Sequence, residues 1–583
     1  MPDFIVVENV SFAYPQHEGQ NHPALCNVHF KVRAGEFAAI IGPNGSGKST
    51  LARLLNALLL PESGQILIDG LDTRDPGNHA RIRSQVGLVF QRPQNQIVAT
   101  TVEEDVAFGP ANLGLDPALI RECVDTALRQ TGLSEYRQRP SHLLSAGETQ
   151  RLALAGVLAM RPRCIIFDET TAMLDPLGRA MVMEQIRELN HQGITVMLIT
   201  HLMEEAALAE RVLLLHDGQL VQDDSPKIVF SDARSIQRYG LGLPPAREAA
   251  LELRKYFPQL TPHILSAQVL LQSLPAFKLK QSSPAKPYAP SNVESAPLVQ
   301  VRGLSYVYQR NTPLAHTALD GLDFSMQERH THALIGATGC GKSTLLQHLN
   351  GLLRPQKGSV RVGPFDLADA DLDVQELRRM VVLAFQQPED QIFEQYVGDE
   401  IAYAPRHLGY QGKLADVVAQ AMQSVGLDFE TYKDRLTSTL SGGEKRKVAL
   451  ASILAIQSQV VLLDEPLAGL DPRSVDELLR TLDQQRQQGK SLLISTHQYE
   501  ELMPILQNVS LLRHGKDFLQ GEAQQVFGQT AKLEEAGLKA PLAAQIADTL
   551  RQRGWPLPGP IASLEKLTAA LAELTPGKGS AHE

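Results

Sequence analysis

The sequence predicts an α/β fold built from two tandem copies of one phosphate-binding unit. Two loops of the pattern G-x-x-x-x-G-K-[ST], beginning at Gly42 and Gly336, each follow an apolar run that is typical of a strand. The motifs around the two loops recur in the same order. Short apolar runs without alternation also predict strands buried on both faces, as in a parallel sheet covered by helices. A chain of 583 residues is long enough for two such units with additions.

The two loops supply the residue types that bind the phosphates of a nucleotide. Their glycines allow backbone N–H groups to surround phosphate oxygens at the start of a helix. The lysine reaches the β- and γ-phosphates, and the serine hydroxyl binds Mg²⁺. The first set is Gly42, Pro43, Asn44, Gly45, Ser46, Gly47, Lys48, Ser49 and Thr50, and the second is Gly336, Ala337, Thr338, Gly339, Cys340, Gly341, Lys342, Ser343 and Thr344.

Two carboxylates end an apolar run in each half, in CIIFDE and in VVLLDE. Asp168 and Asp464 are placed to hold Mg²⁺ directly or through water. The neighbouring Glu169 and Glu465 are placed to polarise an attacking water molecule. The alternative is that an Asp-Glu pair merely ends a strand. Together with the phosphate-binding loops, these pairs predict hydrolysis of a nucleoside triphosphate.

Composition narrows the possible settings of this chemistry. The formal charge of −10 argues against a protein built to coat nucleic acid. The four cysteines have no close pair, so neither a disulfide framework nor a zinc site is expected, and the chain is predicted to be cytosolic. No run approaches 20 apolar residues, and the N-terminus lacks the pattern of a secretory signal. Any membrane role is therefore expected to come through partners.

Motif spacing and composition suggest five segments. The order is a first cassette, an appendage, a Pro/Ser-rich linker, a second cassette and a second appendage with a flexible tail. Both appendages are expected to form a turn, an amphipathic helix, a Pro-containing turn and another short helix. The predicted boundaries are 1–240, 241–275, 276–296, 297–530 and 531–583.

With these motifs in place, the sequence resembles the ATP-binding cassette (ABC) ATPases over nearly its whole length, twice. The signature sequences are Leu144-Ser145-Ala146-Gly147-Glu148 and Leu440-Ser441-Gly442-Gly443-Glu444. The resemblance implies that Ser145, Gly147, Ser441, Gly442 and Gly443 contact ATP. It also implies Q-loop glutamines that contact nucleotide and Mg²⁺ (Gln91, Gln386), D-loops (Met173-Leu174-Asp175, Gly469-Leu470-Asp471), catalytic switch histidines (His201, His497) and tyrosines that stack on adenine (Tyr14, Tyr308). A tyrosine near a strand end is also often only a packing residue.

The resemblance further implies a head-to-tail sandwich in which the cassettes pair within the chain. Each ATP would lie between the phosphate-binding loop of one cassette and the signature of the other. Two residues depart from the regular pattern: Ala146 stands at a glycine position of the first signature, and Thr170 stands where the other half has Pro466. We expect Ala146, through its methyl group and a poor fit to positive φ, to slow the site containing Lys342. The alternative is that alanine fits an ordinary φ there and has no effect.

A narrower resemblance concerns the segments after the two Q-loop glutamines. FQRPQNQIVATTVEEDVAFGPANLGL and FQQPEDQIFEQYVGDEIAYAPRHLGY look like the ATPase subunits of energy-coupling factor (ECF) importers. The appendages look similar as well. This resemblance implies a transmembrane coupling component and a membrane substrate-binding component as partners. It also implies a peripheral position on the cytoplasmic face of the membrane, and a vitamin or transition-metal ion as substrate.

Three alternatives stay open at this stage. The post-Q-loop segments are also consistent with a solvent-exposed helical lobe. The chain could serve a conventional ABC importer, although fused ATPases of that kind commonly have one eroded phosphate-binding loop and both are intact here. A tandem-cassette protein acting on ribosomes or nucleic acid usually has a long charged linker or inserted zinc modules, whereas this linker is short and Pro-rich.

Overall fold

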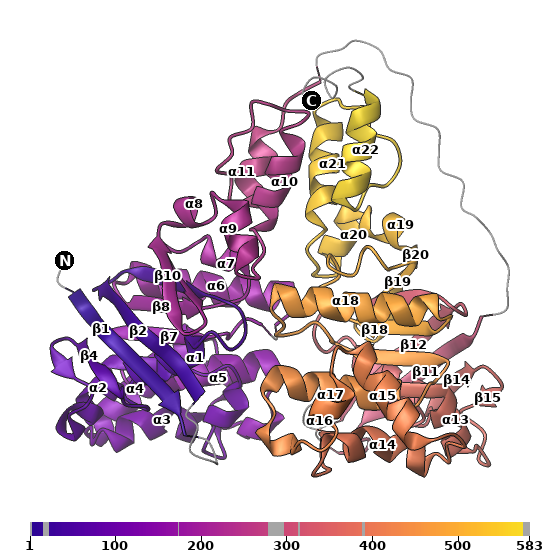
Figure 1. Ribbon diagram of the computed structural model, residues 1–583, viewed down its shortest axis with the longest axis horizontal. Coiled ribbons are helices and arrows are strands. Elements are labelled where there is room, and N and C mark those ends of the chain that lie inside the picture. The colour runs from indigo at the N-terminus through magenta and orange to yellow at the C-terminus, as the bar shows by residue number, and fades with distance from the viewer. Residues whose placement is uncertain are drawn as a thin grey trace. The chain divides into compact units, whose positions relative to one another are not determined.

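The computed structural model describes residues 3–15, 22–172, 174–277, 297–312, 315–386 and 391–574. The chain divides into two compact units, one comprising Met1–Ser273 and Gly469–Arg473 and the other Leu274–Ala468 and Ser474–Glu583. Most of the predicted linker and the predicted tail, at 278–296 and 575–583, lie outside the described residues. Figure 1 shows the helices and strands of both units, coloured along the chain from indigo at the N-terminus to yellow at the C-terminus.

The first unit contains an antiparallel sheet and a mostly parallel sheet. Their strand orders are β2-β1-β4-β5 and β10-β9-β3-β8-β7-β6. The strands are β1 (Asp3–Tyr14), β2 (His22–Arg33), β3 (Phe37–Ile41), β4 (Ser63–Ile68), β5 (Leu71–Asp72), β6 (Val86–Val89), β7 (Cys164–Asp168), β8 (Thr195–Ile199), β9 (Arg211–His216) and β10 (Gln219–Asp224).

Helices of the first unit cover the parallel sheet, form the helical lobe and build the appendage. They are α1 (Lys48–Leu55), α2 (His79–Gln85), α3 (Val102–Asn112), α4 (Pro117–Gln130), α5 (Ala146–Ala159), α6 (Pro176–His191), α7 (Met203–Ala206), α8 (Pro226–Val229), α9 (Ala233–Arg238), α10 (Pro245–Leu253) and α11 (Ala267–Ser273). The short 3-10 helices are η1 (Pro76–Asn78), η2 (Pro93–Gln96), η3 (Ser134–Tyr136) and η4 (Ser141–Leu143).

The second unit repeats this architecture. Its sheets have the orders β12-β11-β14-β15 and β16-β17-β18-β13-β19-β20. The strands are β11 (Val299–Tyr308), β12 (His316–Met326), β13 (Thr331–Ile335), β14 (Lys357–Val362), β15 (Phe365–Asp366), β16 (Val381–Ala384), β17 (Val460–Asp464), β18 (Ser491–Ser495), β19 (Asn508–Arg513) and β20 (Lys516–Glu522). The helices are α12 (Lys342–Leu349), α13 (Val374–Met380), α14 (Val397–His407), α15 (Leu414–Ser424), α16 (Phe429–Tyr432), α17 (Gly442–Leu454), α18 (Pro472–Gln487), α19 (Ala523–Phe527), α20 (Thr530–Glu535), α21 (Leu542–Gln552), α22 (Leu564–Leu574) and the 3-10 helix η6 (Thr437–Thr439).

The central parallel strands position the functional groups of each unit. In the first unit, β8 lies between β3 and β7, and every residue of these three strands is buried. The phosphate-binding loop follows β3, Asp168 ends β7, and the segment leading to His201 follows β8. Because neighbouring parallel strands end at the same sheet edge, the three segments meet there, as open α/β sheets require.

The helix after the first phosphate-binding loop is shorter than its apolar sequence suggests. The run STLARLLNALLL predicts a helix to Leu60, but α1 ends at Leu55. Asn56 caps the helix, and Ala57 takes a left-handed backbone with φ of 54°. The apolar residues beyond this turn therefore belong to the loop that leads into β4.

The appendages contain the helix pairs that the repeat predicts. The paired elements are α10 with α11 in the first unit and α21 with α22 in the second. The Pro-containing turns separate the two helices of each pair. Proline at the first position of α10 is favourable because an N–H there would have no intrahelical acceptor, and proline has no N–H.

Candidate nucleotide site

The first phosphate-binding loop forms a cradle between β3 and α1. Gly47 has φ of 97°, and a Cβ there would lie 2.5 Å from the carbonyl oxygen of Ala24, so only glycine fits. Lys48 Nζ donates hydrogen bonds to the carbonyl oxygens of Gly42 at 2.8 Å and Pro43 at 2.9 Å. The ammonium group is thus held against its own loop, where phosphate oxygens can replace these carbonyls.

The second loop has the same construction between β13 and α12. Gly341 has φ of 105°, and a Cβ would lie 2.6 Å from a methyl group of Leu319. Lys342 Nζ donates to the carbonyl oxygens of Gly336 at 2.7 Å and Ala337 at 3.3 Å. Both loops therefore present a lysine and backbone N–H groups at a helix N-terminus, which suits phosphate.

Each unit also brings a serine to the aspartate predicted to hold Mg²⁺. Ser49 Oγ donates to Asp168 Oδ1 at 2.9 Å. Burial, together with the neighbouring charge of Glu169, raises the pKa of Asp168 to about 6. In the second unit, burial raises the pKa of Asp464, which is hydrogen-bonded to Ser343. These pairs offer the oxygen ligands that Mg²⁺ prefers. The pKa of each aspartate stays raised because burial outweighs the attraction of the nearby lysine, Lys48 or Lys342.

In the first unit, the Glu169 carboxylate contacts two other residues that the sequence predicts for the site, His201 and Gln91. Glu169 Oε1 lies 2.5 Å from His201 Nε2, and Glu169 Oε2 accepts a hydrogen bond from Gln91 Nε2 at 2.6 Å. Burial raises the pKa of Glu169, but the contact with His201 outweighs this effect and the pKa lies below its usual value. Glu169 therefore stays ionised, as a residue that accepts a proton from water must be.

Glu465 occupies the matching place with different contacts. Its Oε2 lies 2.8 Å from His497 Nδ1 and accepts from the His497 backbone N–H at 3.2 Å. Its Oε1 lies 3.7 Å from Lys342 Nζ. Burial opposes ionisation, yet the histidine lowers the pKa of Glu465 overall. Gln386 is exposed and is not among the described contacts of Glu465.

Both catalytic candidates have left-handed backbones, with φ of 51° at Glu169 and 48° at Glu465. A non-glycine residue in this region is strained by about 1–3 kcal/mol. The same strain at equivalent positions of two units indicates that it serves the site. It turns the glutamate out of the strand and toward the histidine.

The tyrosines predicted to stack on adenine lie close to the phosphate-binding helices. Tyr14 Oη lies 3.2 Å from Thr50 Oγ1, and Tyr308 Oη lies 3.3 Å from Thr344 Oγ1. Each ring packs edge-on against the aromatic ring two residues earlier in its strand. Their rings are therefore held at the edge of the cradle, and stacking on adenine stays a prediction.

The signature serines cap the helices of the two lobes. Ser145 caps α5 and Ser441 caps α17, each in a reciprocal pair with the glutamate three residues later, Glu148 or Glu444. These capping boxes were overlooked at the sequence level, although the spacing S-x-x-E signals them. These capping boxes hold the N-terminus of each helix in place, and the other backbone N–H groups of its first turn can bind an anion.

The backbone part of the expectation for Ala146 is wrong. Ala146 is the first residue of α5 and does not belong to the residues with positive φ. Its counterpart Gly442 likewise begins α17, and a Cβ there would meet no described atom within 4 Å outside its chain neighbours and the nearby backbone of α17. The helical backbone of this position therefore does not require glycine.

With the cradles, carboxylates and capped signatures in place, comparison with known proteins is decisive. A family profile described as ABC transporter matches residues 25–172 and 319–468. The chain belongs to the ABC transporter family. It is an ATPase with two ABC cassettes.

Relatives match either the whole chain or one half of it. An ABC transporter ATP-binding protein of Caldanaerobacter subterraneus subsp. tengcongensis is 32% identical over 94% of this chain and 96% of its own. The energy-coupling factor transporter ATP-binding protein EcfA1 of Symbiobacterium thermophilum is 52% identical over 46% of this chain and 96% of its own. A solved structure of CbiO1 from Clostridium perfringens, described as part of the ABC transporter complex CbiONQ, is 35% identical over 40% of this chain and 94% of its own, with a TM-score of 0.37.

The segment after each Q-loop glutamine is anchored to its lobe by a buried carboxylate. Asp105 accepts from the backbone N–H groups of Val98 and Ala99 in the first cassette. Glu400 accepts from those of Phe393 and Glu394 in the second. The anchors leave Val98 61% exposed and Phe393 63% exposed. Glu389 and Asp390, part of the predicted coupling segment, and Met173 of the first D-loop lie outside the described residues.

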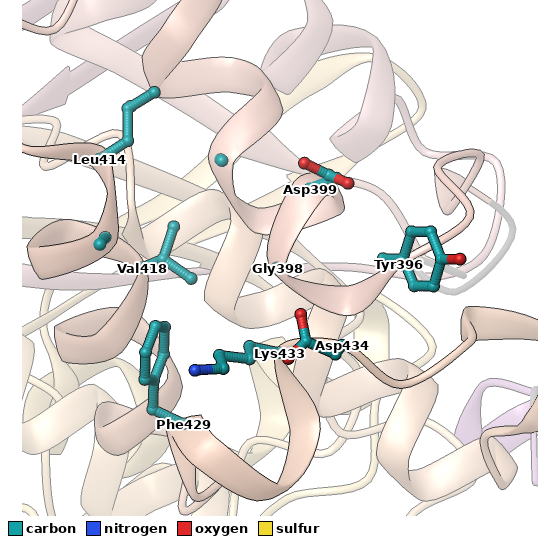
Figure 2. A pocket seen from close by; sticks show the side chains of 10 residues that line it. Tyr396, Gly398, Asp399, Leu414, Val418, Phe429, Lys433 and Asp434 are labelled. Carbon is teal, nitrogen blue, oxygen red and sulfur yellow. The ribbon is translucent and has the colours of Figure 1, made fainter.

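The second lobe carries a recess of about 240 Å³ beside α14, shown in Figure 2. Equivalent backbone hydrogen bonds show which positions of the two lobes correspond. Glu103 N–H donates to the Arg137 carbonyl in the first lobe, and Gly398 N–H donates to the Lys433 carbonyl in the second. In the first lobe the Glu103 carboxylate accepts from Arg137 at 2.6 Å. In the second, glycine removes that carboxylate, and the Lys433 ammonium points toward the ring of Phe429 (Figure 2). The two lobes therefore present different surfaces.

Among the described residues, no helix is both long and apolar enough to cross a membrane.

Proposed function

We propose that this chain is the ATP-hydrolysing subunit of an ECF-type importer that brings a vitamin or transition-metal ion into the cell. The observation that supports this most is the 52% identity of one half to a protein named as an energy-coupling factor transporter ATP-binding protein. The chain would bind the cytoplasmic face of the membrane peripherally. Its partners would be a transmembrane coupling component and a membrane substrate-binding component, and no nucleic acid is involved.

In this proposal, two ATP molecules lie in a head-to-tail sandwich of the cassettes. Lys48 and Lys342 bind the β- and γ-phosphates, and the pairs Ser49–Asp168 and Ser343–Asp464 hold Mg²⁺. Bound Mg²⁺ would neutralise phosphate charge during hydrolysis. Glu169 and Glu465 accept a proton from the attacking water, and each is oriented by its histidine. ATP binding joins the cassettes and hydrolysis releases them, which makes their interface the switch.

We further propose that the post-Q-loop segments form the docking surfaces for the coupling component. Exposed apolar side chains that gather in one place are typical of protein–protein contact surfaces. Val98 and Phe108 supply them in the first cassette, and Phe393 and Tyr396 do so in the second. The recess beside Tyr396 adds a pocket for a partner side chain on the second cassette.

Purification from membranes of the source organism tests the assignment. We expect the tagged full chain to co-purify with two polytopic membrane proteins, and the complex in liposomes to take up a vitamin, Co²⁺ or Ni²⁺ when ATP is supplied on the chain's side. Uptake of a sugar through a separate soluble binding protein would favour a conventional importer. Co-purification with ribosomes would overturn a transport role.

A further inference from the structure

A buried glutamate in the first cassette lies outside the groups assigned to ATP and Mg²⁺. Glu205 belongs to α7 and is 2% exposed. Its Oε2 accepts hydrogen bonds from Thr171 Oγ1 at 2.9 Å and from Thr200 Oγ1 at 2.6 Å. Both threonines are themselves buried. One carboxylate oxygen thus ties two segments that are distant in sequence.

These two segments carry the proposed catalytic pair. Thr171 follows Glu169 by two residues, and Thr200 directly precedes His201. The Glu169 backbone N–H also donates to the carbonyl of Ile199 at 3.0 Å, so the segments already run side by side. Glu205 joins the two segments a second time, through the side chains of Thr171 and Thr200, which lie within two residues of Glu169 and His201.

A nearby arginine accompanies the buried charge. Arg179 Nε lies 4.0 Å from Glu205 Oε1, and the arginine side chain is only 13% exposed. Burial raises the pKa of Glu205 above its usual value, and the hydrogen bonds from Thr200 and Thr171 together with the charge of Arg179 offset only part of this effect. Burying a charged pair is costly and contributes little stability by itself. Its place between the two catalytic segments suggests a role in geometry.

The second cassette lacks this arrangement. Leu467 stands in place of Thr171, Val475 in place of Arg179, and Glu501, the counterpart of Glu205, is exposed. Here Ser495 joins the strands instead: its hydroxyl donates to the Asp464 carboxylate and accepts from the Glu465 backbone N–H. The first cassette has Ile199 at that position, which has no hydroxyl group.

We propose that Glu205 is a positioning residue for hydrolysis at the first ATP site, the site of Lys48, Glu169 and His201. It fixes the distance between the segments that carry the glutamate and the histidine, because misplacement of catalytic groups by an ångström costs large factors in rate. The inference rests on the roles proposed above for Glu169 and His201. It assigns no equivalent role to Glu501.

Replacing the carboxylate and each of its partners tests this in the full-length chain. On the Glu465→Gln background, where the first site carries the hydrolysis, Glu205→Ala should lower kcat about fivefold to tenfold and leave KM and MgATP binding unchanged, since it alters only the arrangement for the chemical step. Thr171→Val removes one hydroxyl with little change of shape and should cost about threefold. Thr171→Ser keeps the hydroxyl and should hydrolyse ATP at the rate of the chain without that substitution, unlike Thr171→Val. Glu501→Ala is the matched control and should have no effect.

Double variants separate positioning from general destabilisation. Because Glu205 and Thr171 act through one bond, adding Thr171→Val to Glu205→Ala should lower kcat little further. Adding Glu205→Ala to Glu169→Gln should also change the residual rate little, because the first site is already disabled. Thermal unfolding of each variant shows whether a loss of rate only follows a loss of folded protein.

Three results would overturn the inference: an unchanged kcat in Glu205→Ala, losses that multiply in the double variants, or rates that fall only in step with melting temperature. A separate result would remove its basis. If Glu169→Gln alone leaves hydrolysis intact at both sites, the role proposed for Glu169 fails, and this is measured without any variant of Glu205.

Discussion

The two cassettes agree in the residues that face the nucleotide and differ in the residues that support them. Both have a lysine held on its own loop, a buried aspartate with a raised pKa and a strained glutamate beside a histidine. Behind these groups, the first cassette joins its catalytic segments through Glu205 and the second through Ser495. The lobes differ as well, with a charge network in one and a recess in the other.

This comparison indicates which parts of the chain are free to differ. If both sites bind phosphate and Mg²⁺ as proposed, the same geometry is required of each, which accounts for the repeated groups. Supporting contacts can be made in several ways at similar cost. If the lobes dock a coupling component as proposed, the differences between them would fix the orientation of that partner on the chain.

The largest effect should come from removing both proposed bases together. Glu169→Gln with Glu465→Gln keeps side-chain size and removes both basic carboxylates, so ATP turnover should fall about 100-fold or more while ATP binding persists. Steady-state hydrolysis and equilibrium nucleotide binding measure the two properties. Near-normal hydrolysis by the double variant would overturn the role of both residues and the agreement between the cassettes.

The phosphate-binding lysines should affect binding instead. Lys48→Ala or Lys342→Ala removes the charge that reaches the β- and γ-phosphates, and each should weaken nucleotide affinity at its own site about tenfold or more. Titration with a fluorescent ATP analogue would show one weakened site and one normal site. Normal affinity at both sites in either variant would contradict the assignment.

The lobe surfaces should control coupling and not hydrolysis. Substitutions across Gln94–Ile97 and Glu389–Phe393 should reduce ATP-driven uptake about tenfold while sparing the basal ATPase rate of the isolated chain. Gln94, Asn95 and Phe393 are the sharpest targets because all three are exposed. Gln96 is a poorer target because its amide bonds the backbone of β6 and Phe90. Unchanged uptake after disruptive changes in both lobes would count against the importer proposal.

Single-site variants measure whether the cassettes work at different rates. If the site of Lys48 is the faster one, Glu169→Gln should reduce total hydrolysis a few-fold more than Glu465→Gln. The two variants make the same chemical change, so each serves as the control for the other. Equal losses, or the reverse order, would remove the functional asymmetry and leave the transport proposal untouched.

The sequence predicts the cradles well because short motifs determine them. A glycine at a position with φ near 100° and a lysine at the start of a helix are local requirements, visible in any sequence that meets them. The order β3, β7 and β8 also follows from apolar runs that end in functional residues. The geometry around Ala146 was misjudged because the glycine-rich signature suggests a loop, whereas the helix begins at that residue.

Contacts between distant segments account for what sequence reasoning missed. Glu205 lies in an acidic pair that resembles an exposed helix start, and its counterpart Glu501 is indeed exposed. Only packing against Thr171 and Thr200 makes the first of these a buried tie. The recess in the second lobe is likewise lined by residues from separate segments, among them Gly398, whose counterpart Glu103 bonds Arg137 in the first lobe.

The smallest expected effect separates strain from ligand contact at the signatures. Ala146 begins α5 with an ordinary helical backbone. Ala146→Gly should therefore change the melting temperature by a few degrees at most. In the proposed sandwich this signature faces the ATP bound at Lys342. Measured on the Glu169→Gln background, Ala146→Gly should therefore raise the residual rate by about twofold if the methyl group crowds the γ-phosphate. Gly442→Ala, measured on the Glu465→Gln background, is the reciprocal variant and should lower the rate by a similar factor if a methyl group crowds the γ-phosphate. Unchanged rates in both variants would mean that alanine and glycine are equivalent there, and any remaining difference between the sites would then have to come from other residues, such as Glu205 and Ser495.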